Sequence, residues 1–146
     1  MVHLGGDMKV LIAYESKSGK TKQQALAIAA ACTEAGHETM IKPLSEVIPL
    51  DVEGADALAV GSWVEGFILF GVKPARPARR WLSGLPSLQG KRAGVFCTYA
   101  VNPAASLDIM RRALEAKGAE VVAENSANRR KPESGASEFA KRLVGA

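Results

Sequence analysis

Short apolar runs alternate along the chain with stretches of helical periodicity. The runs predict strands at Lys9–Glu15, Glu38–Lys42, Ala57–Val60, Ala93–Thr98 and Glu120–Glu124. The periodic stretches predict helices at Lys20–Ala35, from Asn102–Pro103 to the stop at Gly118, and at Ala136–Val144. Pro49 leaves at most a short helix within Leu44–Gly54. Strands that alternate with helices predict an α/β fold with a parallel sheet.

The strands differ in polarity, and this difference indicates which of them lies at an edge. The first, third and fourth are nearly unbroken apolar runs, as expected where helices cover both faces of a sheet. The second strand, Glu38–Lys42, is polar enough to lie at an edge, and Gly61 is expected to close the third. We predict a doubly wound five-stranded parallel sheet of order 2-1-3-4-5, a common order of such sheets that places the second strand at an edge. Right-handed crossovers then place the loops after strands one, three and four along one edge.

The loop after the first strand reads Ser16-Lys17-Ser18-Gly19-Lys20-Thr21 and leads directly into a helix. Backbone amides, hydroxyls and the positive end of a helix dipole converge there, which favours an anion such as a phosphate monoester. A nucleoside triphosphate loop would need glycine at Tyr14, and the chain has no Gly-x-Gly-x-x-Gly run for a dinucleotide. The loop therefore suits one phosphate rather than two or three.

The pattern Ser/Thr-x-Ser/Thr-Gly-x-Thr in this loop resembles the FMN-phosphate loop of the flavodoxin family. Ser16, Ser18, Gly19 and Thr21 stand at the matching positions, and the resemblance extends over nearly the whole chain from Met8 onward. It implies a short-chain, flavodoxin-like, FMN-binding domain with FMN as the cofactor.

The resemblance places the flavin ring between the loops after strands three and four. Each of these loops carries one aromatic residue, Trp63 or Tyr99, that can stack on a flat ring. The predicted cofactor-binding residues are Ser16, Lys17, Ser18, Gly19, Lys20, Thr21, Ser62, Trp63, Val64, Glu65, Gly66, Thr98, Tyr99 and Ala100. No catalytic acid or base stands out, and His3 and His37 lack the companions that a metal site requires.

The length of 146 residues suits one domain, which we expect at residues 8–146 behind a disordered leader at residues 1–7. No apolar run is long enough to span a membrane, and the first residues do not form a secretory signal. Cys32 and Cys97 fall in an alanine-rich helix and an apolar strand, where we expect small buried hydrophobes. These features predict a cytoplasmic protein.

The net charge of +4 is modest, but the positive residues are clustered. One group is Lys73, Arg76, Arg79 and Arg80, and the other is Arg129, Arg130 and Lys131. Either group can be a solvated face or a surface for an anionic partner, and no nucleic-acid-binding module accompanies them. Positive charge near the flavin, including Lys17 and Lys20, predicts a less negative potential for forming the reduced anion than in carriers with acidic sites.

These observations favour an FMN-binding electron-transfer protein that serves a redox protein partner or a small hydrophobic acceptor. One alternative is an FMN-dependent oxidoreductase acting on a quinone or porphyrinogen, in which the apolar segment 67–72 contacts the substrate. The other is a domain without a redox role that binds a phosphorylated ligand or a protein. The sequence does not indicate the electron donor, the acceptor or the oligomeric state.

Overall fold

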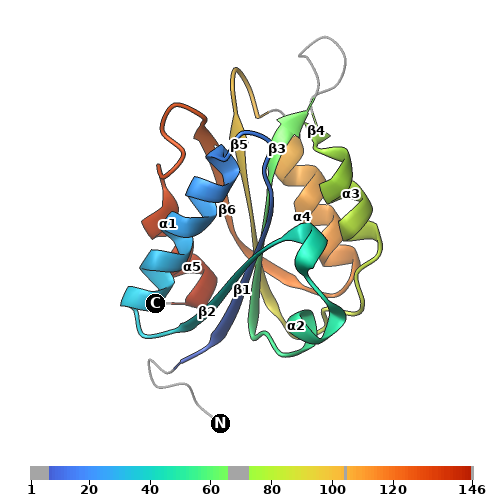
Figure 1. The fold of residues 1–146 in the computed structure, drawn as a ribbon. Coiled ribbons are helices and arrows are strands. Elements are labelled where there is room, and N and C mark those ends of the chain that lie inside the picture. The colour runs from blue at the N-terminus through green and yellow to red at the C-terminus, as the bar shows by residue number, and fades with distance from the viewer. Residues whose placement is uncertain (1–6, 66–72, 104, 146) are drawn as a thin grey trace.

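A computed structural model describes residues 7–65, 73–103 and 105–145, except for the side chains of residues 65, 73 and 74. Its parallel sheet contains β1 (Lys9–Glu15), β2 (Glu38–Pro43), β3 (Ala57–Glu65), β5 (Arg92–Tyr99) and β6 (Glu120–Asn128). The spatial order is β2-β1-β3-β5-β6 (Figure 1), which confirms the predicted order 2-1-3-4-5. A two-residue strand, β4 (Lys73–Pro74), adds an antiparallel pairing to β3 that the sequence did not predict.

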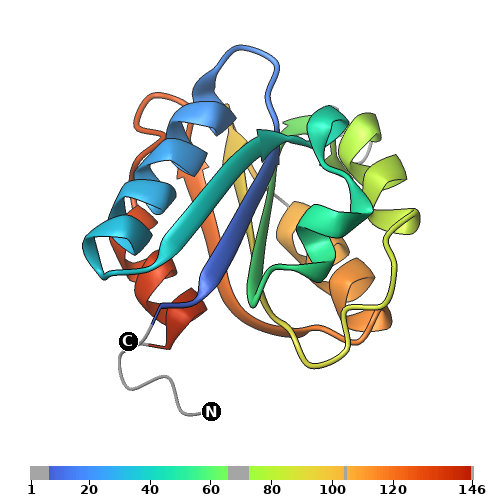
Figure 2. The ribbon, with the colours of Figure 1, turned by 60° about the horizontal axis from the view of Figure 1, so that its bottom comes forward.

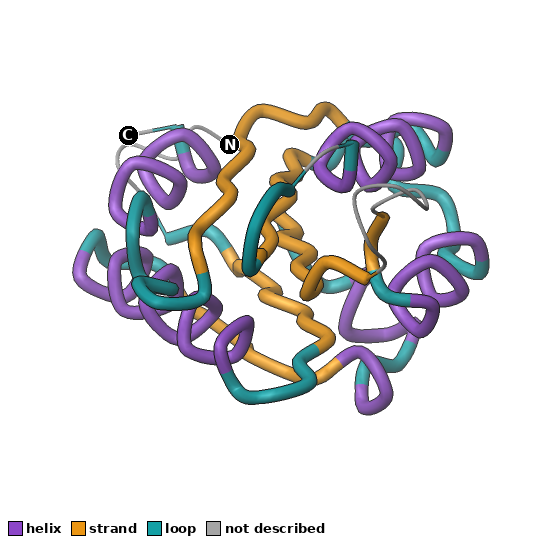
Figure 3. The backbone as a smooth tube through the Cα atoms, turned by 90° about the horizontal axis from the view of Figure 1, so that it is seen from above, coloured by secondary structure: helices purple, strands orange, loops and turns teal. Residues whose placement is uncertain are grey.

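Helices cover both faces of the sheet, as Figure 3 shows from above. One face carries α1 (Lys20–Glu34) and α5 (Ala136–Val144), and the other carries α2 (Pro49–Glu53), α3 (Arg76–Ser83) and α4 (Ser106–Ala116). A single 3₁₀ turn at Leu44–Glu46 follows β2. Within the described ranges, no helix has the length and apolar content needed to cross a bilayer.

The strands divide their side chains between two hydrophobic cores. In β1, Leu11 and Ala13 belong to the core under α3 and α4, whereas Val10, Ile12 and Tyr14 belong to the core under α1 and α5. This alternation follows from the two-residue period of a strand. Because helices cover both faces, both sets are apolar, and β1 is an almost continuous hydrophobic run.

The two cysteines lie one in each core, as predicted. Cys97 is in the core under α4 and Cys32 in the core under α1, and both side chains are fully buried. Burial disfavours the thiolate and raises the pKa of Cys97 to about 12 and that of Cys32 to about 11. Both residues therefore act as small hydrophobes rather than reactive thiols.

The edge position predicted for the second strand is confirmed. β2 pairs with β1 along its length, and none of its six residues is fully buried. In Figure 2 it crosses the front of the twisted sheet with one side unpaired. Its polar residues therefore face a partly solvated environment.

The third strand is longer than predicted, because Gly61 does not close it. β3 continues through Gly61 to Glu65, and Gly61 pairs with Tyr14 of β1 and Phe96 of β5. A Cβ at position 61 would overlap the aromatic ring of Phe96. Glycine is present here because a buried ring occupies the space of a side chain, and not because the strand ends.

Two further boundaries differ from the prediction. β6 extends four residues beyond Glu124, because an edge strand tolerates the polar residues that follow. The helix predicted from Asn102–Pro103 begins at Ser106, with Ala105 rather than Asn102 as its N-cap. The Ser106 amide donates to the carbonyl of Pro103, so the Asn-Pro pair introduces a turn before the helix.

Helix α3 was missed entirely in a region predicted only as a long connection. It begins at Arg76-Pro77, where proline fits the first turn, and buries Ala78 and Leu82 one turn apart. One proline and three arginines within its eight residues hid this short amphipathic pattern. The helix forms one wall of a groove beside the carboxyl ends of β1 and β2.

The buried side chain of Gln24 in α1 should lower the stability of the protein, and this gives a first testable prediction. This side chain is fully buried, and neither amide atom has a hydrogen-bond partner within the described residues. We expect Gln24→Met to raise the free energy of unfolding by about 1 kcal/mol, because methionine has a similar shape without unpaired polar atoms. Urea denaturation measures this change. A decrease of similar size would show that the amide has a partner in solution.

Candidate functional site

The carboxyl ends of β1, β3 and β5 lie next to one another at the edge where ligands bind in doubly wound folds. A cavity of about 240 Å³ opens between the loops that follow these strands. Its lining residues are Lys17, Ser18, Lys20, Trp63, Val64, Thr98, Tyr99, Ala100 and Arg129. Eight of these nine are predicted cofactor-binding residues, so the structure gathers the three predicted loops at one cavity.

The loop after β1 is shaped by Ser16 and Gly19. The Ser16 hydroxyl accepts hydrogen bonds from the amides of Gly19, at 3.0 Å, and of Lys22, at 3.4 Å. Gly19 has a φ of +89°, a left-handed conformation that strains other residues. The amides of Lys20 and Thr21 belong to the first turn of α1 and have no intrahelical acceptor. The loop therefore offers amides to an anion, while the Ser16 side chain supports its fold.

A buried pair of hydroxyls joins the start of α1 to the end of β5. The Oγ1 atoms of Thr21 and Thr98 lie 2.7 Å apart, and both residues are almost fully buried. This hydrogen bond fixes the phosphate-type loop relative to the loop that carries Tyr99. Thr21 itself does not line the cavity of the described structure.

Trp63 lies at the end of β3 and is half-buried. The Lys17 ammonium lies 5.0 Å from the centre of its ring, within the range of a cation–π contact. Its indole nitrogen is buried without a hydrogen-bond partner among the residues that the structure describes. A flat ligand that stacks on the face of Trp63 covered by Lys17 must displace this lysine. An acceptor atom of such a ligand can pair with the indole N–H.

The Ser62 side chain supports the position of Trp63. Ser62 is fully buried, and its hydroxyl donates to the Trp63 carbonyl at 2.7 Å while accepting from the Ala75 amide at 3.0 Å. Only the backbone of Ser62 therefore remains for a ligand. Gly66 and the side chain of Glu65, both predicted to contact the flavin, lie outside the described part of the chain.

Arg129 is a lining residue that sequence reasoning assigned only to a basic cluster. Its backbone amide donates to the Tyr99 carbonyl at 2.8 Å, just beyond the end of β6. The prediction missed it because the fifth strand was ended at Glu124, which left Arg129 far from the cavity. Recognising that an edge strand tolerates polar residues would have extended β6 and brought this arginine to the site.

The cavity's chemistry suits an anionic group attached to a flat ring. Three cations line it (Lys17, Lys20 and Arg129), together with the aromatic rings of Trp63 and Tyr99. No carboxylate is among its lining residues within the described part of the chain. The open amides after Gly19 and the unpaired indole N–H add hydrogen-bond donors. FMN, which joins a phosphate to a flat polar ring, fits this set of groups.

A family model described as a flavodoxin domain matches residues 11–128, which is most of the chain. The chain belongs to the flavodoxin family. Flavodoxins are FMN-binding electron-transfer proteins, so the resemblance seen in the phosphate-type loop is confirmed at the level of the family.

Solved flavodoxins share the fold at low sequence identity. An archaeal flavodoxin is 20% identical with a TM-score of 0.75, and the match covers 94% of this chain and 99% of that one. Flavodoxin 2 from Bacillus cereus is 23% identical with a TM-score of 0.77 and coverages of 94% and 98%. The Streptococcus pneumoniae TIGR4 flavodoxin is 19% identical with a TM-score of 0.77 and the same two coverages. A search of curated proteins found no match.

Proposed function

We propose that this chain binds FMN in the cavity between the three loops and carries electrons between redox partners in the cytoplasm. The observation that supports this most directly is the convergence at one cavity of an anion-binding loop, two aromatic side chains and three cations. The two buried, unpaired thiols fit the reducing cytoplasm.

Each group of lining residues has a distinct role in this proposal. Lys17, Lys20 and the amides after Gly19 hold the phosphate by charge and hydrogen bonds. Trp63 and Tyr99 flank the ring and orient it. FMN supplies the electron-transfer chemistry when it is bound, and the protein sets its position and potential. Because these residues hold the phosphate and the ring, FMN stays bound while its redox state changes.

An FMN titration of the purified apoprotein tests this proposal. We expect a complex of one FMN per chain with quenched flavin fluorescence and a shifted visible spectrum. A folded protein, verified by circular dichroism, that shows no binding at FMN concentrations of tens of micromolar would contradict the proposal. Binding of phosphate or sulfate in that sample would then favour a ligand-binding domain without a redox role.

The cations predict the direction of the redox potential. The fully reduced flavin carries a negative charge, so Arg129 should stabilise it and make its formation less unfavourable. A partly exposed charge is worth about 0.5–1 kcal/mol, so Arg129→Gln should shift the potential by about 20–40 mV to more negative values. A spectroscopic redox titration measures the shift. Arg142→Gln removes the same charge from the last turn of α5 and should leave the potential unchanged.

Electron transfer fits the lining better than specific substrate chemistry does. The described lining residues include no histidine and no carboxylate that could act as a general acid or base. The alternative of a quinone or porphyrinogen oxidoreductase depended on the apolar segment 67–72, which lies outside the described residues. No observation in the structure favours that alternative.

A further inference from the structure

The surface around the proposed FMN cavity carries cations without carboxylate partners. In the described part of the chain, Lys17, Lys20 and Arg129 line the cavity, and none of them takes part in an ion pair. Arg130 and Lys131 follow Arg129 and are exposed, and they too lack ion pairs with any described residue. We call these five residues the basic rim.

Several cations elsewhere on the molecule are paired with carboxylates. Lys42 lies 2.8 Å from Asp51, Arg92 lies 3.9 Å from Glu120, and Arg112 lies 2.9 Å from Asp108. Arg111 contacts three carboxylates, those of Asp108, Glu115 and Glu124. The basic rim differs in that five cations, three of them consecutive, gather at the proposed cofactor opening without an ion pair to any described residue.

Backbone hydrogen bonds hold the segment Arg129–Lys131 of the basic rim in a defined position. The Arg129 amide donates to Tyr99 across to β5, and the Arg130 amide donates to the Asn128 side chain at 3.0 Å. The Lys131 amide donates to the Asn128 carbonyl at 2.8 Å. The three successive cations therefore stay next to the loop that carries Tyr99, so a partner bound to them would lie beside the proposed flavin site.

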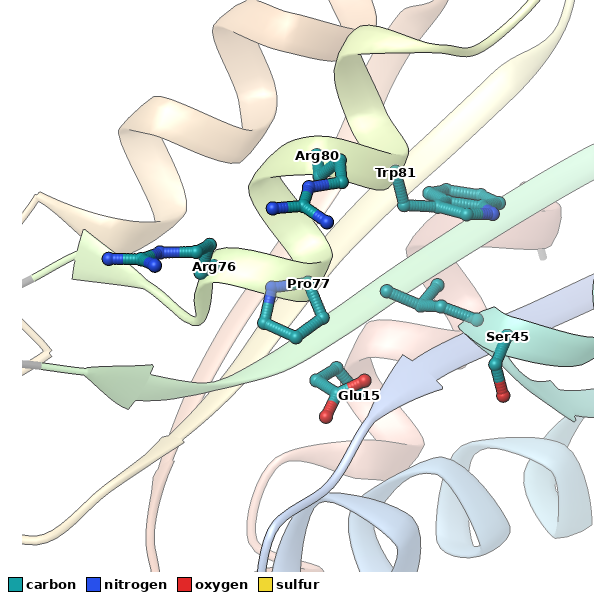
Figure 4. Close-up of a pocket in the computed structure, with 7 residues that line it drawn as sticks. Glu15, Ser45, Arg76, Pro77, Arg80 and Trp81 are labelled. Carbon is teal, nitrogen blue, oxygen red and sulfur yellow. The ribbon is translucent and has the colours of Figure 1, made fainter.

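A groove on the other side of the β1 and β3 ends extends this surface. It measures about 340 Å³ and is lined by Glu15, Leu44, Ser45, Arg76, Pro77, Arg80 and Trp81. In Figure 4, Arg80 and Trp81 come from α3, whereas Glu15 comes from the end of β1 and Ser45 from the 3₁₀ turn after β2, across the groove. Glu15 pairs in register with Ser62, the neighbour of Trp63, so the groove adjoins the cavity.

The groove combines an apolar floor with a positive edge. Leu44, Pro77 and Trp81 supply apolar surface, and Arg80 on α3 supplies a cation. Protein interfaces commonly have such an apolar centre with arginine and tryptophan beside it. The groove and the basic rim together form a surface that is complementary to an apolar contact surrounded by carboxylates.

From this distribution of charge we infer that the electron-transfer partner is an acidic redox protein, which docks on the basic rim and the adjoining groove. The inference rests on the proposed function, since it assigns the partner of the same site. One electron leaves the reduced protein of the pair and enters the oxidised one, and no bond forms or breaks. Charge complementarity would raise the rate of encounter and orient the partner at the cofactor opening.

Calorimetric titrations of the FMN-loaded protein with two oxidised probes test the inference without electron transfer. The acidic probe is a plant-type [2Fe–2S] ferredoxin, and the basic probe is mitochondrial cytochrome c. We expect ferredoxin to bind, and its affinity to fall at least about tenfold as the salt concentration rises from about 20 mM to about 200 mM. Cytochrome c should not bind. Tighter binding of cytochrome c would overturn the inference.

A pair of charge-reversed variants locates the docking surface. Arg130→Glu/Lys131→Glu changes the basic rim without altering a residue that lines the cavity, and should weaken ferredoxin binding at least about tenfold. Lys9→Glu/Arg142→Glu makes the same change in net charge at the opposite end of the sheet, and should weaken it less than about twofold. Equal losses in the two variants would overturn the inference.

Two further measurements distinguish an acidic protein partner from a nucleic acid, and a failure to dock from a failure to bind FMN. Duplex DNA is titrated under the same conditions, and binding tighter than that of ferredoxin would assign the basic rim to a nucleic acid instead. The visible flavin spectrum of every sample reports whether FMN is bound. A chain that fails to bind FMN contradicts the proposed function, whereas an FMN-loaded chain that ignores ferredoxin contradicts only the docking inference.

Discussion

Replacing Gly61 with alanine is expected to lower the free energy of unfolding by about 3 kcal/mol. The position lies in the middle of β3, paired on both sides, so the strand cannot move away. An added Cβ would overlap three carbons of the Phe96 ring. Native domains are stable by only about 5–15 kcal/mol, so this single methyl group would remove a large part of the stability.

The Phe96 ring has no room to retreat. It is fully buried and lies edge-on to Phe139, with the ring centres 5.7 Å apart. Phe139 in turn occupies the space above Gly94, where an added Cβ would come within 2.6 Å of its ring. The two glycines and two aromatic rings therefore pack against one another between β3, β5 and α5. Added volume at Gly61 should displace both rings.

Urea denaturation of Gly61→Ala measures the loss, and Gly84→Ala is the matched control. Gly84 follows α3 with a φ of −93°, and an added Cβ there would approach no atom closer than 3.7 Å. We expect the control to change the stability by less than about 0.5 kcal/mol. Adding Phe96→Leu to Gly61→Ala should recover part of the loss in a double-mutant cycle. Equal stabilities of the two alanine variants would contradict the close approach.

The same glycine illustrates how far the sequence predicts this fold. The apolar runs of β1 and β5 and the polar run of β2 predicted which strands are interior and which lies at an edge, because burial on both faces requires continuous hydrophobicity. Gly61 misled the prediction, since a glycine that ends a strand and a glycine that admits a distant ring look alike in sequence. The ring comes from Phe96, 35 residues later in the chain, and only the sheet register brings the two together.

The candidate site shows the same limit. Local patterns predicted the loop at Ser16–Thr21 and the aromatic residues Trp63 and Tyr99, because each lies at the carboxyl end of its own strand. Arg129 and the groove wall formed by α3 could not be predicted in this way. Arg129 reaches the cavity because β6 is longer than predicted, and the groove wall was missed because no helix was predicted at α3. Arg129 belongs to the basic rim and α3 forms a wall of the adjoining groove, so both contribute to the surface from which the acidic partner is inferred.

Removal of the Trp63 ring should have the largest effect on FMN affinity. Stacking of an aromatic side chain on a flat heterocycle is worth about 1–3 kcal/mol, so Trp63→Ala is expected to weaken FMN binding by about fivefold to 150-fold. Trp63→Phe keeps a stacking face and should weaken it by no more than about threefold. Fluorescence titration measures both affinities, and thermal unfolding verifies that both variants fold.

The phenylalanine variant decides between two roles of Trp63. Its indole N–H is buried without a partner in the described structure, so it could bind an acceptor on the ligand rather than stack. A loss of affinity in Trp63→Phe as large as in Trp63→Ala would assign the energy to that hydrogen bond. The chain has two tryptophans, so Trp81→Phe leaves Trp63 as the only one, and FMN should quench its emission. If quenching is absent while FMN binds, the ring lies elsewhere, and stacking on Trp63 is wrong.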